Sequence, residues 1–192
     1  VKNSCNPVFV EIGQRLGKEK LYKYIKAFGF GSVTGIKLPG EAKGIVRELS
    51  GVGPVELANN AFGQGISVTP IQLITAFSAV ANDGMLMEPR IAKKVIDDEG
   101  NTVHEFQPRK VRQVISRETS ATMRQILEFA IAPTASSYIP GYKVAGKTGT
   151  AQKAEGGVYV SGKFVSSFCG FAPANDPKVS VLVVIDEPGG EH

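Results

Sequence analysis

The chain has 192 residues, a mass of 20.4 kDa and 22 basic against 18 acidic side chains, which give a net charge of +4. This length allows one domain with a hydrophobic core, and an apolar fraction of 42% excludes disordered and fibrous classes. No apolar run is long enough to span a membrane. Two cysteines form no disulfide framework, and two distant histidines form no metal motif, so no metal is expected as a ligand. Because the positive charge is dispersed along the chain, nucleic acid is not expected as a ligand either.

Two helices are predicted near the N-terminus. Asn6 is a typical N-cap and Pro7 a typical first helical residue, and apolar side chains then recur at helical spacing through Leu16. A second helix is predicted to end at Gly29, and residues 29–65, rich in glycine, are predicted to be irregular. The exposed face of the second helix is interpreted as solvated surface and carries Lys18, Lys20, Lys23 and Lys26.

The middle of the chain is predicted to hold two more helices and a hairpin between them. Thr69-Pro70-Ile71-Gln72 is typical of a capping box and predicts a buried helix that ends at Asn82-Asp83-Gly84. Residues 91–97 and 102–106 are predicted to pair as a hairpin. Ser116 is predicted to cap an amphipathic helix. The apolar face of that helix is predicted to contain Met123, Ile126, Leu127 and Ala130.

Three strands are predicted in the C-terminal part, at 142–152, 164–172 and 178–186. The connections between them are too short for crossover helices, which parallel neighbours would need. Helices followed by consecutive strands therefore predict an α+β fold, with helices packed on an antiparallel β-sheet.

One motif suggests a nucleotide hydrolase. Gly141–Thr148 reads Gly-Tyr-Lys-Val-Ala-Gly-Lys-Thr, which matches the phosphate-loop pattern, and 181–186 resembles an apolar strand that ends in a magnesium-binding aspartate. A phosphate loop lies between a buried strand and a long helix. Here Pro140 precedes the motif and several glycines follow it, so this reading is the less favoured alternative.

The same stretch contains Lys147-Thr148-Gly149-Thr150 inside a predicted strand. On a strand that lines a cleft, the lysine would attract an anionic substrate, the threonine hydroxyls would bind a carboxylate, and the glycine would let a ligand approach closely. Near the N-terminus, Ser4-Cys5-Asn6 places a hydroxyl and an amide two residues apart at a helix entry. Such a pair can relay a proton and hold a substrate amide, although it is also consistent with a simple helix cap.

Together these motifs resemble the transpeptidase domain of class B penicillin-binding proteins, particularly those of Gram-positive division and sporulation. The resemblance extends over nearly the whole chain. It includes four further segments: Phe28–Gly31 with Thr34–Glu41, Gly63–Leu73, Phe168–Ala174 and Val183–Pro188. It implies a β-lactamase/transpeptidase-like fold and a cofactor-free serine enzyme at the outer face of the cell membrane.

The resemblance also implies substrates and roles. The enzyme would cross-link peptidoglycan stem peptides that end in D-Ala-D-Ala, bind β-lactams, and work with division or sporulation proteins. Ser4 would pass a proton to the leaving amine, Asn6 would hold the substrate amide, and Lys147 would polarise Ser4. Thr148 and Thr150 would bind the substrate carboxylate, with Gly149 between them and the Thr150 N–H as an oxyanion donor.

The chain departs from this family at the nucleophile. No serine is followed by lysine three residues later, and His104 and His192 offer no alternative triad. Residues 1–192 are therefore expected to be a partial domain, truncated at both ends, inactive alone, with the nucleophile and a membrane anchor upstream. A non-catalytic wall-binding relative and a β-lactamase are the alternatives. In such a partial domain, the apolar strand 178–186 would form an exposed edge of the sheet. The monomer of the 192-residue chain is therefore expected to be poorly stable.

The two cysteines allow two interpretations. Cys5 lies inside the Ser-x-Asn motif, and Cys169 lies on a strand predicted to flank it. Both are consistent with small buried apolar side chains. Alternatively, they provide a redox-sensitive thiol at the active site, since the implied compartment permits disulfides.

Overall fold

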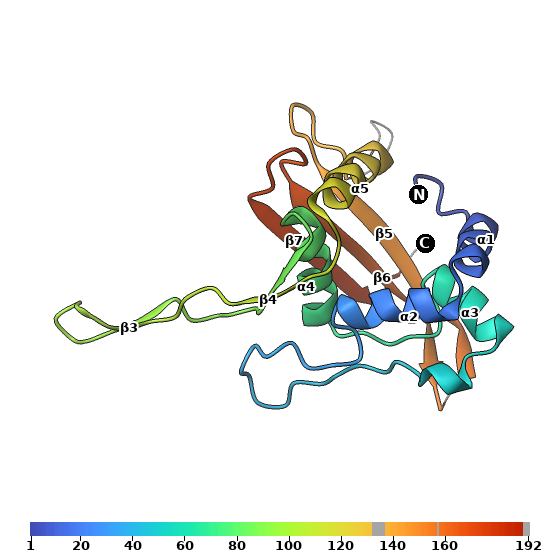
Figure 1. Cartoon of the computed structure of the whole chain (residues 1–192), viewed down its shortest axis with the longest axis horizontal. Coiled ribbons are helices and arrows are strands. Elements are labelled where there is room, and N and C mark those ends of the chain that lie inside the picture. Colours follow the sequence, from blue (N-terminus) through green and yellow to red (C-terminus); the bar gives the residue numbers. More distant parts are fainter. Residues whose placement is uncertain (132–136, 157, 190–192) are drawn as a thin grey trace.

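The computed structural model describes residues 1–131, 137–156 and 158–189, which form helices packed on antiparallel strands (Figure 1). The predicted α+β fold is confirmed. The elements in chain order are α1 (Asn6–Leu16), α2 (Lys18–Ala27), the 3-10 helix η1 (Leu49–Gly51), α3 (Pro54–Ala61), α4 (Pro70–Ala81), β1 (Met85–Met87), β2 (Lys94–Ile96), β3 (Thr102–Glu105), β4 (Lys110–Gln113), α5 (Arg117–Ala130), β5 (Ala145–Glu155), β6 (Val158–Ala172) and β7 (Val179–Asp186).

The main sheet contains β5, β6 and β7 in that order, and both pairs are antiparallel. Its register sets Lys147 opposite Cys169 and Cys169 opposite Leu182. The three predicted C-terminal strands are therefore confirmed, with bounds that differ mainly where β5 and β6 extend further than expected.

The core lies between this sheet and helices α4 and α5. Its buried members are Val80, Leu127, Ala145, Phe171 and Ala174. The ring of Phe77 on α4 packs against that of Phe171 on β6, with centroids 5.5 Å apart. Burial of these apolar side chains between the two layers is the main force that fixes the helices on the sheet.

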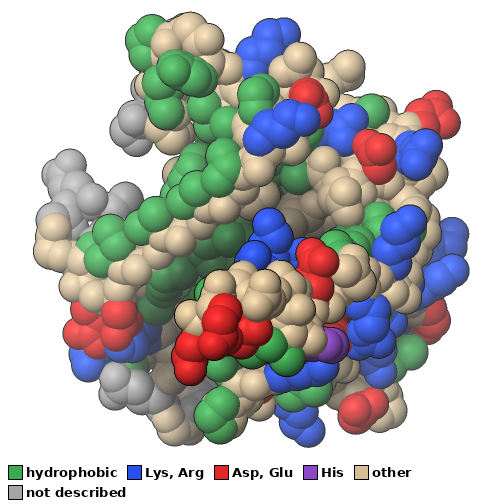
Figure 2. All heavy atoms as spheres, turned by 90° about the vertical axis from the view of Figure 1, so that its left-hand side faces the viewer, with side chains coloured by type: hydrophobic (Ala, Val, Ile, Leu, Met, Phe, Trp, Pro, Cys, Tyr) green, Lys and Arg blue, Asp and Glu red, His purple; other side chains and the backbone are tan. Residues whose placement is uncertain are grey.

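Strand β7 leaves an apolar surface open to solvent. Val179, Val181 and Val183 alternate along it and retain 54%, 47% and 49% exposure. Figure 2, seen from the side on which β7 lies in Figure 1, shows hydrophobic side chains gathered in a stripe. The predicted exposure of this strand is confirmed, and the low stability expected of the isolated monomer remains a prediction.

Helix α4 begins at the predicted capping box. Thr69 Oγ1 accepts a hydrogen bond from Gln72 N at 3.2 Å, and Gln72 Oε1 accepts one from Thr69 N at 2.9 Å. The buried Gln72 amide also donates to the carbonyls of Ser32 and Lys43, at 2.7 and 2.9 Å. One side chain therefore caps the helix and holds two points of the glycine-rich segment beside it.

The prediction that residues 29–65 are irregular is wrong in part, because they contain η1 and α3. Helix α3 begins at Pro54, where the Glu56 carboxylate accepts a hydrogen bond from Gly53 N at 3.0 Å. Asn60 donates to the Tyr22 hydroxyl at 3.0 Å. The short helix packs mainly against α1, and such contacts between distant segments cannot be recognised from glycine content.

The first two helices require two corrections. The N-cap of α1 is Cys5, without a side-chain hydrogen bond, and Asn6 is the first helical residue rather than the predicted cap. On α2, the predicted lysine face is exposed at Lys20, Lys23 and Lys26. Lys18 is half-buried instead, because its Nζ donates to the Val52 carbonyl at 3.4 Å.

Helix α5 confirms its predicted cap but not all of its predicted apolar face. Ser116 Oγ accepts a hydrogen bond from Thr119 N at 3.1 Å. Leu127 is buried in the core, but Ile126 is exposed, contrary to the prediction. Buried Ser120 instead faces α4, where its hydroxyl donates to the Val80 carbonyl at 2.6 Å.

Between α4 and α5 the chain forms an arm that projects far from the body (Figure 1). Its inner part is β1 paired with β4, and β1 was not predicted from the sequence. Its outer part is the predicted hairpin of β2 and β3, shorter than expected, with His104 exposed. None of the helices in the described part of the chain has the length and hydropathy needed to cross a membrane.

Candidate functional site

Strand β5 presents the motif Lys147-Thr148-Gly149-Thr150 at the edge of the main sheet. Among the described strands the motif pairs with β6 alone, with Lys147 opposite Cys169 and Thr150 opposite Ser166. The strand continues without interruption to Glu155. Because no helix begins at Thr148, the phosphate-loop interpretation is wrong.

The side chain of Lys147 is half-buried and lies against the next residue of the strand, Thr148. Its Nζ donates to the Thr148 carbonyl at 2.8 Å and to Thr148 Oγ1 at 3.3 Å. Within residues 1–131, 137–156 and 158–189, no carboxylate forms an ion pair with it. Burial lowers the pKa of Lys147 below 10.5, because a charged amine is less favourable where water is excluded. Attraction of an external anion by this lysine remains a prediction.

Lys153, further along β5, shows the opposite arrangement. Its Nζ lies 2.7 Å from a Glu187 oxygen and 3.0 Å from an Asp186 oxygen. These hydrogen bonds, first to Glu187 and then to Asp186, raise the pKa of Lys153 to about 12. The two lysines thus differ in their surroundings, because among the described residues Lys153 has acidic partners at the end of β7 and Lys147 has none.

Gly149 lies tightly against β6. A Cβ at this position would come within 2.9 Å of Ser167 Oγ, and that hydroxyl donates to the Gly149 carbonyl at 3.4 Å. Ser167 therefore supports the motif from the neighbouring strand. The sequence gives no signal for this role, since it depends on strand register.

The second motif begins the first helix. Ser4 has a left-handed backbone with φ of 46°, and its N–H donates to the Val1 carbonyl at 3.1 Å. Such a conformation is uncommon outside glycine and is often found at functional sites. The side chains of Ser4 and Asn6 are exposed and make no hydrogen bond with other described residues, so both remain available to a ligand.

Helix α5 contacts both the strand that carries the lysine motif and the N-terminal segment. It packs on β5, and together with the N-terminal segment it borders a cavity of about 670 Å³. The lining residues are Val1, Lys2, Asn3, Cys5, Val8, Phe9, Gln125, Ile126 and Phe129. Lys2 Nζ lies 5.4 Å from the centroid of the Phe129 ring, a cation–π distance that ties the N-terminus to α5.

The structure thus brings Lys147–Thr150 together on one strand. It places Ser4 just before helix α1 and Asn6 at the first residue of that helix. No hydrogen bond in the described part of the chain joins the two groups. Their action on one substrate remains a prediction. Within that part, no three His, Cys, Asp or Glu side chains are grouped to hold a metal ion. His192 lies outside the described residues.

The two cysteines differ in exposure. Cys5 is exposed, so the interpretation as a buried apolar residue is wrong for it, whereas Cys169 is 5% exposed and fits that interpretation. At pH 8, we expect a disulfide-exchange reagent to modify Cys5 quickly and Cys169 only after denaturation. Spectrophotometric titration of thiols measures this, with Cys5→Ser as the control that loses the fast phase. Equal rates for both thiols would contradict the assignment.

Burial also raises the pKa of the Cys169 thiol from 9.0 to about 11. The folded chain therefore keeps this proton over a range where the unfolded chain loses it. The resulting stabilisation is complete below pH 9.0 and is lost as the pH rises through about 11. The hypothesis that oxidation of one of these thiols alters activity stays a prediction.

Comparisons with known proteins point to one family. The family model described as the penicillin binding protein transpeptidase domain matches residues 1–192. Stage V sporulation protein D of Bacillus subtilis is 54% identical over 193 residues, which are 99% of this chain and 30% of that protein. Penicillin-binding protein PbpB of Mycobacterium tuberculosis is 35% identical, over 96% of this chain and 29% of that protein. The chain spans less than a third of either relative.

Solved structures show the same fold. Penicillin-binding protein 3 from Mycobacterium tuberculosis, complexed with aztreonam, superimposes with a TM-score of 0.88 at 33% identity, over 97% of this chain and 44% of that one. A peptidoglycan synthetase from Bifidobacterium adolescentis gives a TM-score of 0.87 at 30% identity, over 99% of this chain and 36% of that one. The predicted β-lactamase/transpeptidase-like fold is confirmed.

Proposed function

The chain belongs to the family of penicillin-binding protein transpeptidase domains, and on this basis we propose that it forms part of a serine D,D-transpeptidase. The observation that carries the proposal is the open strand β5. There, half-buried Lys147 has no acidic partner among the described residues, and Thr148, Gly149 and Thr150 are exposed beside it. This arrangement suits a peptide that ends in a carboxylate.

The nucleophile belongs to a part of the protein outside these residues. The 192 residues contain no Ser-x-x-Lys, and the chain spans 30% of the sporulation relative. In the proposed reaction, a serine oxygen bonds to the carbonyl carbon of the penultimate D-alanine. The peptide bond to the terminal D-alanine breaks, and that residue leaves with a proton on its amine. An amine of a neighbouring stem peptide then attacks the ester, and the serine regains its proton.

The residues of this chain would act on both steps. Ser4 would pass the proton to the leaving amine, Asn6 would hold the substrate amide, and Lys147 would polarise Ser4 and attract the substrate carboxylate. Thr148 and Thr150 would bind that carboxylate where Gly149 gives room. The Thr150 N–H would stabilise the oxyanion, because a fixed backbone donor favours the charge that develops there.

The ligands and location follow from the same proposal. Two similar mycobacterial structures are complexes with aztreonam and with ampicillin, and the protein that contains this chain would be acylated by β-lactams in the same way. Its substrate would be a peptidoglycan stem peptide that ends in D-Ala-D-Ala. It would be anchored in the cell membrane, act on the extracytoplasmic face, and work beside division or sporulation proteins.

Labelling with a fluorescent penicillin tests this proposal. The whole protein that contains the chain should become covalently fluorescent in denaturing gels, and should release D-alanine from a peptide that ends in D-Ala-D-Ala. A sample denatured by heat before labelling is the control. A folded protein that gives neither label nor D-alanine would contradict the proposal and favour the non-catalytic wall-binding relative.

A further inference from the structure

Strand β6 lies between β5 and β7, so its backbone groups bond to the two neighbours in turn. At one end the Phe164 carbonyl accepts a hydrogen bond from Glu187 N, and at the other the Ala172 carbonyl accepts one from Lys178 N, both at 2.9 Å. The direction of these groups reverses at each residue of a strand. Even-numbered residues of β6 between these ends therefore bond toward β7, and odd-numbered ones, including Ser167, bond toward β5.

The same alternation fixes the direction of the backbone groups in the lysine-bearing motif. Gly149 is opposite Ser167, so the Gly149 N–H and carbonyl point toward β6. A trans peptide sets its carbonyl and the following N–H in opposite directions. The Thr150 N–H therefore points to the other side of β5, where no described strand pairs with it. One peptide group thus has a carbonyl that faces the sheet and an N–H that faces the open edge.

The hydroxyl of Ser167 reaches the carbonyl of this peptide group. Its Oγ donates to the Gly149 oxygen at 3.4 Å. Because a carbonyl oxygen has two lone pairs, it can accept this bond in addition to one from the backbone of β6. Glycine leaves the space that the hydroxyl needs, since a Cβ on Gly149 would come within 2.9 Å of Ser167 Oγ. A donor at the carbonyl polarises the peptide group and makes the N–H at its other end a stronger donor.

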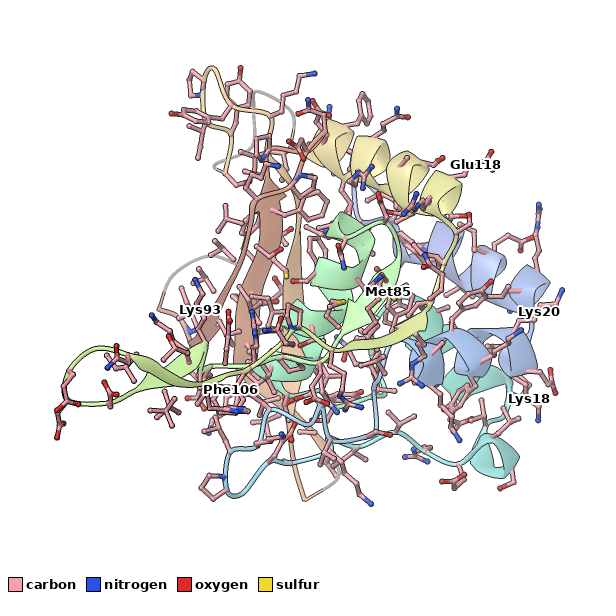
Figure 3. The ribbon with its side chains drawn as sticks, turned by 60° about the vertical axis from the view of Figure 1, so that its left-hand side comes forward. Lys18, Lys20, Met85, Lys93, Phe106 and Glu118 are labelled. Carbon is pink, nitrogen blue, oxygen red and sulfur yellow. The ribbon has the colours of Figure 1, made fainter. Side chains whose placement is uncertain are left out.

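The side chain of Ser167 lies on the face of the sheet that the helices cover. Phe171 is on the same face of β6, because side chains alternate along a strand, and it packs against Phe77 of α4. Figure 3, in which Glu118 marks the start of α5, shows α4 and α5 on one side of the main sheet. The preceding residue, Ser166, points to the opposite face, and its hydroxyl bonds to none of the described residues of β5.

We propose that Ser167 is a positioning residue for acylation, whose hydroxyl holds the Gly149–Thr150 peptide group so that the Thr150 N–H points at the oxyanion. This inference rests on the proposed function, in which that N–H stabilises the oxyanion. A donor that is fixed before the reaction stabilises the developing charge without having to reorient. Ser167 acts through Gly149 and not on the substrate, and its hydrogen bond of 3.4 Å is long, so its removal slows acylation less than removal of Lys147.

Ser167→Ala, tested in the whole protein that contains this chain, removes only the hydroxyl. At saturating β-lactam, the acylation rate constant should fall about fivefold, the size expected for the loss of one neutral hydrogen bond. The β-lactam concentration that gives half of the maximal rate should change by less than about twofold, because the oxyanion forms only in the transition state. Ser167→Thr keeps a hydroxyl at this position and should restore the rate constant to within about twofold of the wild type.

Ser166→Ala is the matched control, since it makes the same change on the opposite face and should leave the rate constant within about twofold of the wild type. Circular dichroism melts verify that the variants fold alike. Equal rate constants in the two alanine variants, a change in the half-saturating concentration alone, or no recovery in Ser167→Thr would overturn the role of Ser167. The wild type is still acylated in all of these cases, whereas a wild type without acylation would contradict the proposed function itself.

Discussion

Lys147→Ala is expected to slow acylation of the whole protein by a β-lactam by about 100-fold or more. Removing a group that takes part in proton transfer, or that stabilises developing charge, typically slows a reaction by about this factor. The amine lies half-buried on the open strand β5, where burial lowers its pKa and no described carboxylate neutralises it. The rate of labelling with fluorescent penicillin, followed over time, gives the measurement.

Lys153→Ala is the matched control on the same strand. Its ammonium is held by Glu187 and Asp186, and exposed ion pairs contribute little, so acylation should change by less than about threefold. Equal losses from the two variants would show that the effect is structural, and would contradict a role for Lys147 in the reaction.

The pH profile separates charge from proton transfer. If the ammonium attracts the substrate carboxylate, the wild-type rate should fall as the pH rises through the pKa of Lys147, which lies below 10.5. The Lys147→Arg variant keeps its positive charge at every accessible pH. The decrease in its acylation rate at alkaline pH should therefore disappear, even if the variant is slower than the wild type at all pH values. An unchanged alkaline limb in the arginine variant would remove Lys147 as its source.

Gly84→Ala is expected to destabilise the chain by about 3 kcal/mol, from backbone strain and overpacking together. Gly84 has φ of 78°, a conformation that alanine rarely adopts, and a Cβ there would overlap the Ile115 carbonyl and come within 2.8 Å of Ile115 Cγ1. Its backbone also accepts from Val114 N at 2.8 Å, so the end of α4 cannot move aside freely. Urea denaturation followed by circular dichroism measures the loss.

Gly100→Ala separates the two causes. Gly100 has a similar φ of 87°, but a Cβ there would meet no atom within 4 Å. Only the conformational cost remains, about 1 kcal/mol. A loss at Gly84 no larger than that at Gly100 would show that the contact with Ile115 relaxes and that overpacking contributes nothing.

Much of the fold could be predicted because its signals are local. The cap at Thr69 acts within three residues of its own helix, and so does the cap at Ser116. Strands β5, β6 and β7 were predicted from short turns and alternating or apolar runs, and those turns alone required antiparallel pairing. Such features depend on backbone hydrogen bonds and side-chain spacing inside one segment.

The candidate site could be predicted in part for the same reason. The types and spacing of Lys147, Thr148 and Thr150 indicated anion binding, and the structure places them on one open strand. The contact of Ser167 with Gly149 could not be predicted, because it exists only in one strand register. Cys5 and Cys169 are alike as residues, yet one is exposed and the other buried, since burial depends on what neighbouring segments cover.

The sequence by itself therefore determined the helices with strong caps, the antiparallel order of the last strands and the residue types that the lysine-bearing strand presents. Only the tertiary structure decided that α3 is a helix, that Met85–Met87 pairs with β4, and that Ile126 points outward. Each of these depends on a partner far away in the chain. The free energy of such a contact comes from surfaces buried together, which no single segment contains.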